Sequence, residues 1–153
     1  MTTAFDVSAL GEGMLEFNQT RAGEPNYLQG FGGDTSNAAI AAARAGARTA
    51  YLSRVGNDSF GRALLELWQR EGVNTQAVQQ DAAAHTGIYF VTHGANGHEF
   101  SYMRAGSAAS RMTPQWLDGE AAQTIRASRI LHVSGISLAI SPTALAPALA
   151  AMP

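Results

Sequence analysis

The chain has 153 residues, a formal net charge of −2 and a charged fraction of only 14%. It is long enough to bury the core of one ordinary domain, and it carries no basic cluster that would neutralise the phosphates of a nucleic acid or a membrane surface. It contains no cysteine, which excludes a disulfide framework, a thiolate nucleophile and a cysteine metal site. No signal segment is visible at the start, and we expect a cytoplasmic protein.

The first part of the chain predicts three short strands, a glycine-rich loop and a helix. The strands are expected at residues 5–10, 14–19 and 27–31, with a turn-rich connector at 21–26. Residues 30–37 then read Gly-Phe-Gly-Gly-Asp-Thr-Ser-Asn. An alanine-rich segment follows directly, and it predicts a helix over about 35–45 that ends at Gly46.

The glycine-rich loop is a candidate binding site. Adjacent glycines let the backbone adopt dihedral angles that other residues avoid and let a ligand approach the main chain. Asp34, Thr35 and Ser36 are each plausible N-caps, and the free N–H groups of a helix start favour an anion or a polyhydroxyl ligand. A tight turn without a ligand is the alternative. Asp34 and Asn37, whose side chains can bind hydroxyl groups, favour the binding site.

The remaining chain continues to alternate strands with helices. The expected elements are a strand at 49–55, a helix at 59–70, strands at 87–92 and 99–104, a helix from 114 towards 128, a strand at 129–133 and a last helix that starts at 141. This alternation predicts an α/β fold with a parallel sheet and right-handed crossovers. An Asn-Gly pair at 96–97 indicates a hairpin between its two strands. We expect the segments 14–31 and 87–104 to form a separate small antiparallel sheet that covers the site as a lid.

These motifs, in this order, resemble the N-terminal half of PfkB-type, ribokinase-like carbohydrate kinases. The resemblance rests on the Gly-Gly-x-x-x-Asn loop, the alanine-rich helix, the string RVGNDSFG at 54–61 and Glu-Gly-Val at 71–73. It extends from about Val7 to the end of the chain. The strings GEGMLEF at 11–17, GFGGDTSN and SGISLAI at 134–140 are most similar to the branch of the family that phosphorylates 2-keto-3-deoxygluconate.

The resemblance implies a ribokinase-like core of parallel strands with helices and a small antiparallel β lid, truncated C-terminally. Residues 1–153 would form the N-terminal part of a single kinase domain, with lid strands at about 14–31 and 87–104. The implied activity is ATP-dependent phosphorylation of the sugar acid at its terminal hydroxyl. A homodimer through apolar lid residues is also expected, and the residues available for it are Tyr89, Val91, Phe100 and Tyr102.

The resemblance also implies a sugar-acid pocket. Its expected residues are Gly33, Asp34 and Asn37 from the loop, Glu16 from the second strand, and Tyr89, Tyr102 and Arg104 from the lid. Because side chains alternate along a strand, Tyr102 and Arg104 share a face. The planar fork of an arginine can hold a carboxylate in two parallel hydrogen bonds, which favours a sugar acid over a neutral sugar. The alternatives are that Arg104 is a solvated strand-end residue and that Glu16 is an exposed edge-strand charge.

The transfer chemistry has no motif in the sequence. The family carries its catalytic aspartate in a Gly-Ala-Gly-Asp helix start, and this chain has no such segment. We therefore expect ATP, Mg²⁺ and the catalytic base to belong to the complete enzyme, and the chain alone to be inactive. Two alternatives stay open: a fructokinase- or ribokinase-like enzyme that acts on a neutral sugar, and a non-catalytic sugar-binding fragment.

Two further motifs are interpreted as structural. Gly11-Glu12-Gly13 begins like a dinucleotide fingerprint, but Glu16 stands where a third glycine belongs and a strand pattern follows instead of a helix. His93 and His98 flank the predicted hairpin loop and could face each other. With no third ligand apparent, they are interpreted as polar hairpin residues rather than a metal site.

Overall fold

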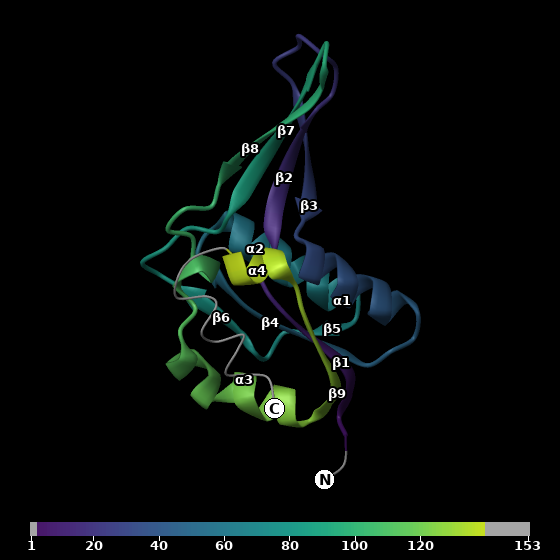
Figure 1. Ribbon diagram of the computed structural model, residues 1–153, viewed down its shortest axis with the longest axis vertical. Coiled ribbons are helices and arrows are strands. Elements are labelled where there is room, and N and C mark those ends of the chain that lie inside the picture. Colours follow the sequence, from purple (N-terminus) through teal and green to yellow (C-terminus); the bar gives the residue numbers. More distant parts are fainter. Residues whose placement is uncertain (1–2, 140–153) are drawn as a thin grey trace.

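The computed structural model describes residues 3–139 and shows an α/β body from which a long arm of strands projects (Figure 1). The strands of the body are β1 (Phe5–Leu10), β4 (Thr49–Gly56), β5 (Val73–Asn74), β6 (Val78–Asp81) and β9 (Ser128–Val133). They form a parallel sheet in the order β5-β4-β1-β9, and β6 pairs with the second half of β4. The expected parallel core is confirmed.

Helices cover both faces of this sheet, as a parallel sheet requires. The helical elements are α1 (Asp34–Arg44), α2 (Ser59–Arg70), η1 (Ala109–Arg111), η2 (Pro114–Asp118), α3 (Glu120–Arg126) and α4 (Gly135–Ala139). Tyr51 and Val55 of β4 pack with Trp68 of α2 in one cluster, while Leu52 packs with Leu117 of η2 in another. This alternation follows from the two-residue period of a strand. None of the helices within residues 3–139 is long and apolar enough to cross a membrane.

The arm is a four-stranded sheet, here called the lid sheet. Its strands are β2 (Met14–Gln19), β3 (Tyr27–Gly32), β7 (Ile88–Gly94) and β8 (Gly97–Met103), in the order β3-β2-β7-β8. The expected lid is confirmed, and each hairpin is antiparallel as predicted. The two hairpins are joined by β2 and β7, which run parallel. The lid sheet is therefore mixed, because its central strands both leave the body in the same direction (Figure 1).

The start of α1 differs from the prediction. Gly33 is the N-cap, with φ at 108°, and it has no side chain to cap the helix. Thr35 and Ser36 are buried and serve the core instead: Thr35 Oγ1 lies 2.9 Å from the Tyr51 hydroxyl, and Ser36 Oγ accepts a hydrogen bond from Trp68 Nε1 at 2.8 Å. The interpretation of these side chains as caps was wrong because both point into the protein, where polar groups need partners.

The helix predicted from 114 towards 128 is also interrupted. Gly119 has a non-helical backbone, with φ at −122° and ψ at −130°, and it separates η2 from α3. The short strands β5 and β6 and the helix α4 were not predicted. The helix predicted from residue 141 lies outside the described residues.

Candidate functional site

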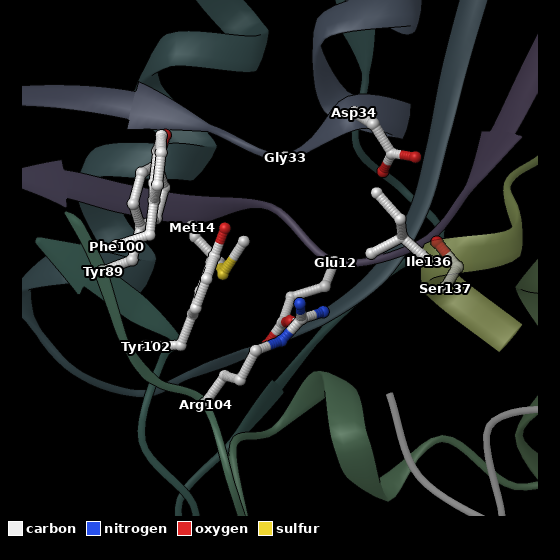
Figure 2. A pocket seen from close by; sticks show the side chains of 10 residues that line it. All are labelled: Glu12, Met14, Gly33, Asp34, Tyr89, Phe100, Tyr102, Arg104, Ile136 and Ser137. Atoms are coloured by element: carbon white, nitrogen blue, oxygen red, sulfur yellow. The ribbon is translucent and has the colours of Figure 1, made fainter. Parts of the chain in front are cut away.

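A cavity of about 150 Å³ lies where the lid sheet meets the body (Figure 2). Its volume is below the roughly 300–1,000 Å³ of pockets for drug-sized ligands, so it suits a small molecule. The lining comprises Glu12, Met14, Gly33, Asp34, Tyr89, Phe100, Tyr102, Arg104, Ile136 and Ser137. These residues come from the start of α1, from three lid strands and from α4. The cavity is therefore formed by both the body and the lid sheet.

The floor of the cavity is the turn between β1 and β2, which carries Glu12. This side chain is almost fully buried, with 3% of the residue exposed. The loop before α1 passes against the turn so closely that a Cβ atom on Gly33 would lie 2.4 Å from the Glu12 carbonyl oxygen. Gly33 also has a positive φ that favours glycine. The second glycine of the Gly-Gly pair therefore lets the start of α1 lie beside Glu12.

Glu12 holds Arg104 in a partly buried ion pair. Arg104 Nη2 lies 2.5 Å from Glu12 Oε2, and Ser107 Oγ donates a hydrogen bond to Glu12 Oε1 at 2.6 Å. Burial raises the pKa of the Glu12 carboxyl above its ordinary value, although Arg104, Ser107 and His85 each act to lower it. Among the groups that favour the charged form of Glu12, the Arg104 guanidinium is therefore the main one.

Aromatic rings form the lid side of the cavity. The Tyr89 and Tyr102 ring centroids are 5.5 Å apart, those of Phe100 and Tyr102 are 6.3 Å apart, and Arg104 Cζ lies 5.9 Å from the Tyr102 ring. The Tyr89 hydroxyl donates a hydrogen bond to Glu16. Burial, followed by this bond to Glu16, raises the pKa of the Tyr89 phenol. Such a wall can pack against the apolar face of a sugar ring while its hydroxyls bind elsewhere.

Five of the seven residues predicted for the pocket line this cavity, namely Gly33, Asp34, Tyr89, Tyr102 and Arg104. Asn37 is exposed on α1 and is not among the lining residues. Glu16 is not among them either, and its carboxylate binds the hydroxyl of Tyr89. Glu16 therefore acts on the cavity through Tyr89.

Sequence reasoning missed Glu12, Met14, Phe100, Ile136 and Ser137. The sequence did carry a signal for Glu12, because an acidic residue between two glycines at the end of a strand indicates a side chain in a tightly packed turn. Its partners could not be read from that signal, since Arg104 and Ser107 lie more than 90 residues away along the chain.

The apolar lid residues expected at a dimer surface fall into two groups. Tyr89 and Val91 are buried and pack with Met14, at 9% and 4% exposure. Phe100 and Tyr102 are more than half exposed, at 53% and 54%. Of the four residues expected at a dimer surface, Phe100 and Tyr102 are therefore the two that the lid exposes.

The histidine pair and the two cavities fit neither a metal ion nor a nucleotide. His93 Nδ1 and His98 Nδ1 lie 2.7 Å apart, so the two rings do face each other. Among residues 3–139 no group of three His, Asp or Glu side chains could hold a metal ion. A second hollow of about 440 Å³ beside β6 has Glu120 as its charged lining residue. The cavity has Arg104 as its cationic lining residue and the second hollow has none, so neither offers the cluster of cationic groups that a nucleoside triphosphate requires.

Comparisons with known proteins find carbohydrate kinases. A family model described as pfkB family carbohydrate kinase matches residues 3–152. The 2-dehydro-3-deoxygluconokinase of Thermoproteus tenax is 37% identical over 143 residues, which cover 89% of this chain and 43% of that protein. Fructokinase-2 of Solanum habrochaites is 33% identical over 142 residues, which cover 89% of this chain and 42% of that protein.

Solved structures agree with this assignment. The crystal structure of a PfkB protein from Polaromonas sp. JS666 has a TM-score of 0.86 and 36% identity, covering 95% of this chain and 49% of that one. A fructokinase with bound ATP from Xylella fastidiosa has a TM-score of 0.78 and 25% identity, covering 87% of this chain and 40% of that one. The chain spans less than half the length of each of these relatives. With its fold and a family match over residues 3–152, it belongs to the pfkB family of carbohydrate kinases.

Proposed function

We propose that this chain supplies the sugar-binding half of an ATP-dependent kinase that phosphorylates 2-keto-3-deoxygluconate at its terminal hydroxyl. The observation that carries the choice of a sugar acid is Arg104. Its guanidinium is the cationic group in the lining of the cavity, and within residues 3–139 its Nε has no hydrogen-bond partner. A buried N–H without a partner favours a ligand that brings an acceptor to it.

Each part of the cavity has a role in this proposal. Arg104 binds the substrate carboxylate, and the Tyr89 and Tyr102 rings pack against the carbon chain. Asp34, in the first turn of α1, accepts hydrogen bonds from sugar hydroxyls. ATP supplies the phosphoryl group when bound. The part of the described residues in this proposal is to bind and orient the acceptor, since the cavity carries a single cation and residues 3–139 hold no cluster of three metal-binding side chains.

A neutral sugar is the second candidate, since fructokinases are also among the relatives. It is favoured by the ion pair that Arg104 already makes with Glu12. If that pair is only structural, the guanidinium is committed to the protein and has no need of a substrate carboxylate. The two candidates therefore differ in whether the Arg104 guanidinium contacts the ligand.

Nuclear magnetic resonance of the Arg104 side chain distinguishes a sugar acid from a neutral sugar as the ligand. The Nε–Hε resonance of Arg104 would be followed during titration of the chain with 2-keto-3-deoxygluconate and, separately, with fructose. We expect a saturable shift with the sugar acid and a much smaller one with fructose, because only the acid brings a carboxylate. Saturation by fructose with no response to the acid would overturn the sugar-acid assignment. Binding of neither would overturn the sugar-binding function.

A further inference from the structure

The candidate sugar site contains more negative than positive charge. Glu12 and Asp34 contribute two carboxylates to the lining, and Arg104 contributes one guanidinium. A sugar acid would bring a third carboxylate into a partly closed space that holds one cation. Like charges brought together in a poorly solvated site disfavour the ionised form of one of them. The substrate can therefore be accommodated most easily if one protein carboxylate becomes neutral.

We propose that binding of a sugar acid is coupled to the uptake of one proton by Glu12, whose carboxylate gives up Arg104 to the carboxylate of the substrate. The inference rests on the proposed function, and it adds a specificity role to a residue outside the predicted set. The proton comes from the solvent, the Glu12 carboxylate becomes a carboxylic acid, and no bond of the sugar changes.

The contacts of Glu12 make it the acceptor of this proton. Oε2 forms an ion pair with Arg104 Nη2 and accepts no hydrogen bond within residues 3–139, while Oε1 accepts one from Ser107. Once Arg104 turns to the substrate, a buried carboxylate would be left with a single neutral donor. A charge in that position is costly, whereas a neutral carboxylic acid keeps the Ser107 bond and gains a donor of its own.

Asp34 is a poorer acceptor. Its side chain is only partly buried and its Oδ1 accepts a hydrogen bond from the Thr35 backbone N–H at 2.8 Å. It also stands in the first turn of α1, where the helix dipole stabilises a negative charge. Asp34 therefore keeps a hydrogen-bond donor of its own when the substrate binds, whereas Glu12 would lose its cationic partner.

The other groups around Glu12 also support Glu12 as the group that takes up the proton. Arg104 at the end of β8 and His85 before β7 lower the pKa of Glu12, but burial raises it further than they lower it. The neighbouring phenols of Tyr51, Tyr89 and Tyr102 come from β4, β7 and β8, and the α4 residues at the cavity, Ile136 and Ser137, carry no charge. Arg104 is therefore the main group that keeps Glu12 ionised, and it is the group that the substrate engages.

The coupling has a measurable consequence for affinity. Where Glu12 is ionised in the free protein and protonated in the complex, one proton is taken up per ligand bound. The dissociation constant for the sugar acid should then rise about tenfold for each unit of pH in that range. A neutral sugar leaves the Glu12–Arg104 pair in place and should show no such dependence.

The direct test is a carbon-13 titration of the Glu12 side-chain carboxyl. Chain labelled at glutamate would be titrated from pH 5 to pH 9, both free and saturated with 2-keto-3-deoxygluconate. We expect the midpoint of the Glu12 signal to lie at least one pH unit higher in the complex. The carboxyl of the ligand does not interfere, because only the glutamates of the chain carry the label.

Two matched variants identify the group that takes the proton. Glu12→Gln keeps the shape and the acceptor for Ser107 but cannot titrate, so its affinity for the sugar acid should be independent of pH. Asp34→Asn should bind more weakly and keep the pH dependence. If Glu12→Gln fails to fold, the wild-type carbon-13 titration decides alone.

The outcomes separate the inference from the proposed function. Saturable binding of the sugar acid with the same Glu12 midpoint in both states would overturn the proton coupling and leave the proposed function standing. A pH dependence that survives Glu12→Gln and disappears in Asp34→Asn would also overturn it. No binding of the sugar acid at any pH would overturn the proposed function, and the coupling with it.

Discussion

The guanidinium of Arg104 already has a carboxylate partner, because Glu12 Oε2 lies 2.5 Å from its Nη2. Removing either member leaves the other as an unpaired charge in a partly buried site, which is more costly than losing the pair itself. A single substitution at Arg104 therefore changes both the ligand contact and the environment of Glu12. The two effects separate only when variants of both residues are compared.

Arg104→Ala should weaken binding of 2-keto-3-deoxygluconate by roughly 10- to 100-fold. A charge-assisted hydrogen bond in such a site contributes about 1.5–3 kcal/mol, and each 1.4 kcal/mol is about tenfold in affinity. Arg104→Lys should recover only part of the loss, since a point charge cannot reproduce the planar fork. Dissociation constants from ligand titrations of the three proteins, with fructose in parallel, measure this.

The control is Arg104→Ala made together with Glu12→Gln, which removes the unpaired charge at the cavity floor. The double variant should recover stability lost in the single variant, while its affinity for the sugar acid stays low. Equal losses of affinity for the sugar acid and for fructose would show that Arg104 supports the lid and does not recognise the carboxylate.

Five of the ten residues that line the candidate site were predicted, because the family resemblance placed the glycine loop, the lid tyrosines and Arg104 in it. Asn37 and Glu16 were placed in the same pocket, but Asn37 is exposed and Glu16 binds Tyr89. Glu12 was missed because its role depends on contacts across more than 90 residues. The sequence pattern of one element predicts which of its side chains share a face. It does not predict which side chains of another element they contact.

At the scale of elements, Asp58 connects the start of α2 to Thr86, which precedes β7. The string RVGNDSFG contains Asp58 but gives no sign of this contact. Asp58 is the N-cap of α2, where its Oδ1 accepts from the Gly61 N–H at 2.7 Å. The same carboxylate accepts from the Thr86 backbone N–H and hydroxyl, each at 2.8 Å. Asp58 therefore fixes the start of α2 and anchors the segment that leads into β7.

Asp58→Ala should lower the free energy of unfolding by about 2 kcal/mol, the upper end for loss of an N-cap, because the Thr86 donors also lose their acceptor. Chemical denaturation at pH 7 measures the change. Asp118→Ala is the matched control, since Asp118 is exposed and forms no ion pair with residues 3–139. A comparable loss in Asp118→Ala would refute a specific role for the cap.

The same carboxylate should also contribute to acid sensitivity. Burial raises the pKa of Asp58, but its hydrogen bonds from Gly61 and Thr86 lower it further, so the folded pKa lies below the ordinary value. A lowered folded pKa means that the stabilisation is complete above the unfolded pKa of about 3.9 and is lost as pH falls through the folded pKa. Asp58→Asn should flatten the stability profile below about pH 4. If urea unfolding gave the same loss of stability below about pH 4 for Asp58→Asn and the wild type, this prediction would be contradicted.

Element boundaries followed the sequence closely where caps and glycines mark them, as for β1, β2 and α2. The prediction failed for β5 and β6, which have two and four residues and are too short for a periodic pattern. It also failed at Gly119, because a glycine within a helical pattern is tolerated in some proteins and breaks the helix in this one. The edge strands form because β4 offers them a partner, which is a tertiary effect.

At the scale of the whole molecule, the alternation of strands and helices predicted the parallel sheet, and two hairpin signals predicted the lid. The parallel pairing of β2 with β7 could not be predicted, because no turn connects these strands. The chain also covers 43% of its Thermoproteus tenax relative and contains no Gly-Ala-Gly-Asp segment. The proposed function therefore assigns this chain to the acceptor side of the kinase.

The chain alone should release no ADP when incubated with ATP, Mg²⁺ and 2-keto-3-deoxygluconate. Phosphoryl transfer needs bound phosphates, metal ions and a base near the acceptor hydroxyl, and the described residues offer no such set. A coupled assay for ADP, with heat-denatured protein as the blank, measures this. Turnover proportional to the amount of protein would refute the assignment of the chain to the acceptor side alone.

The last prediction concerns the open side of the sheet. Within residues 3–139, β9 pairs with β1 and with no further strand, and Ile130 on this strand is 58% exposed. An unpaired strand edge with an exposed apolar side chain favours association with another chain. We expect the isolated chain to associate as its concentration rises, and to unfold below about 60 °C, within the range of ordinary mesophilic domains.

Sedimentation velocity over a range of concentrations measures this association. Substitution of an exposed apolar residue by lysine then shows which surface forms the contact. Ile130→Lys should keep the chain monomeric, because a lysine on an edge strand opposes pairing. Leu28→Lys is the control on the lid, where Leu28 is 70% exposed. Loss of association in Leu28→Lys alone would place the contact on the lid instead of the β9 edge. A wild-type chain that stays monomeric and melts sharply above about 60 °C would show that the β9 edge needs no partner.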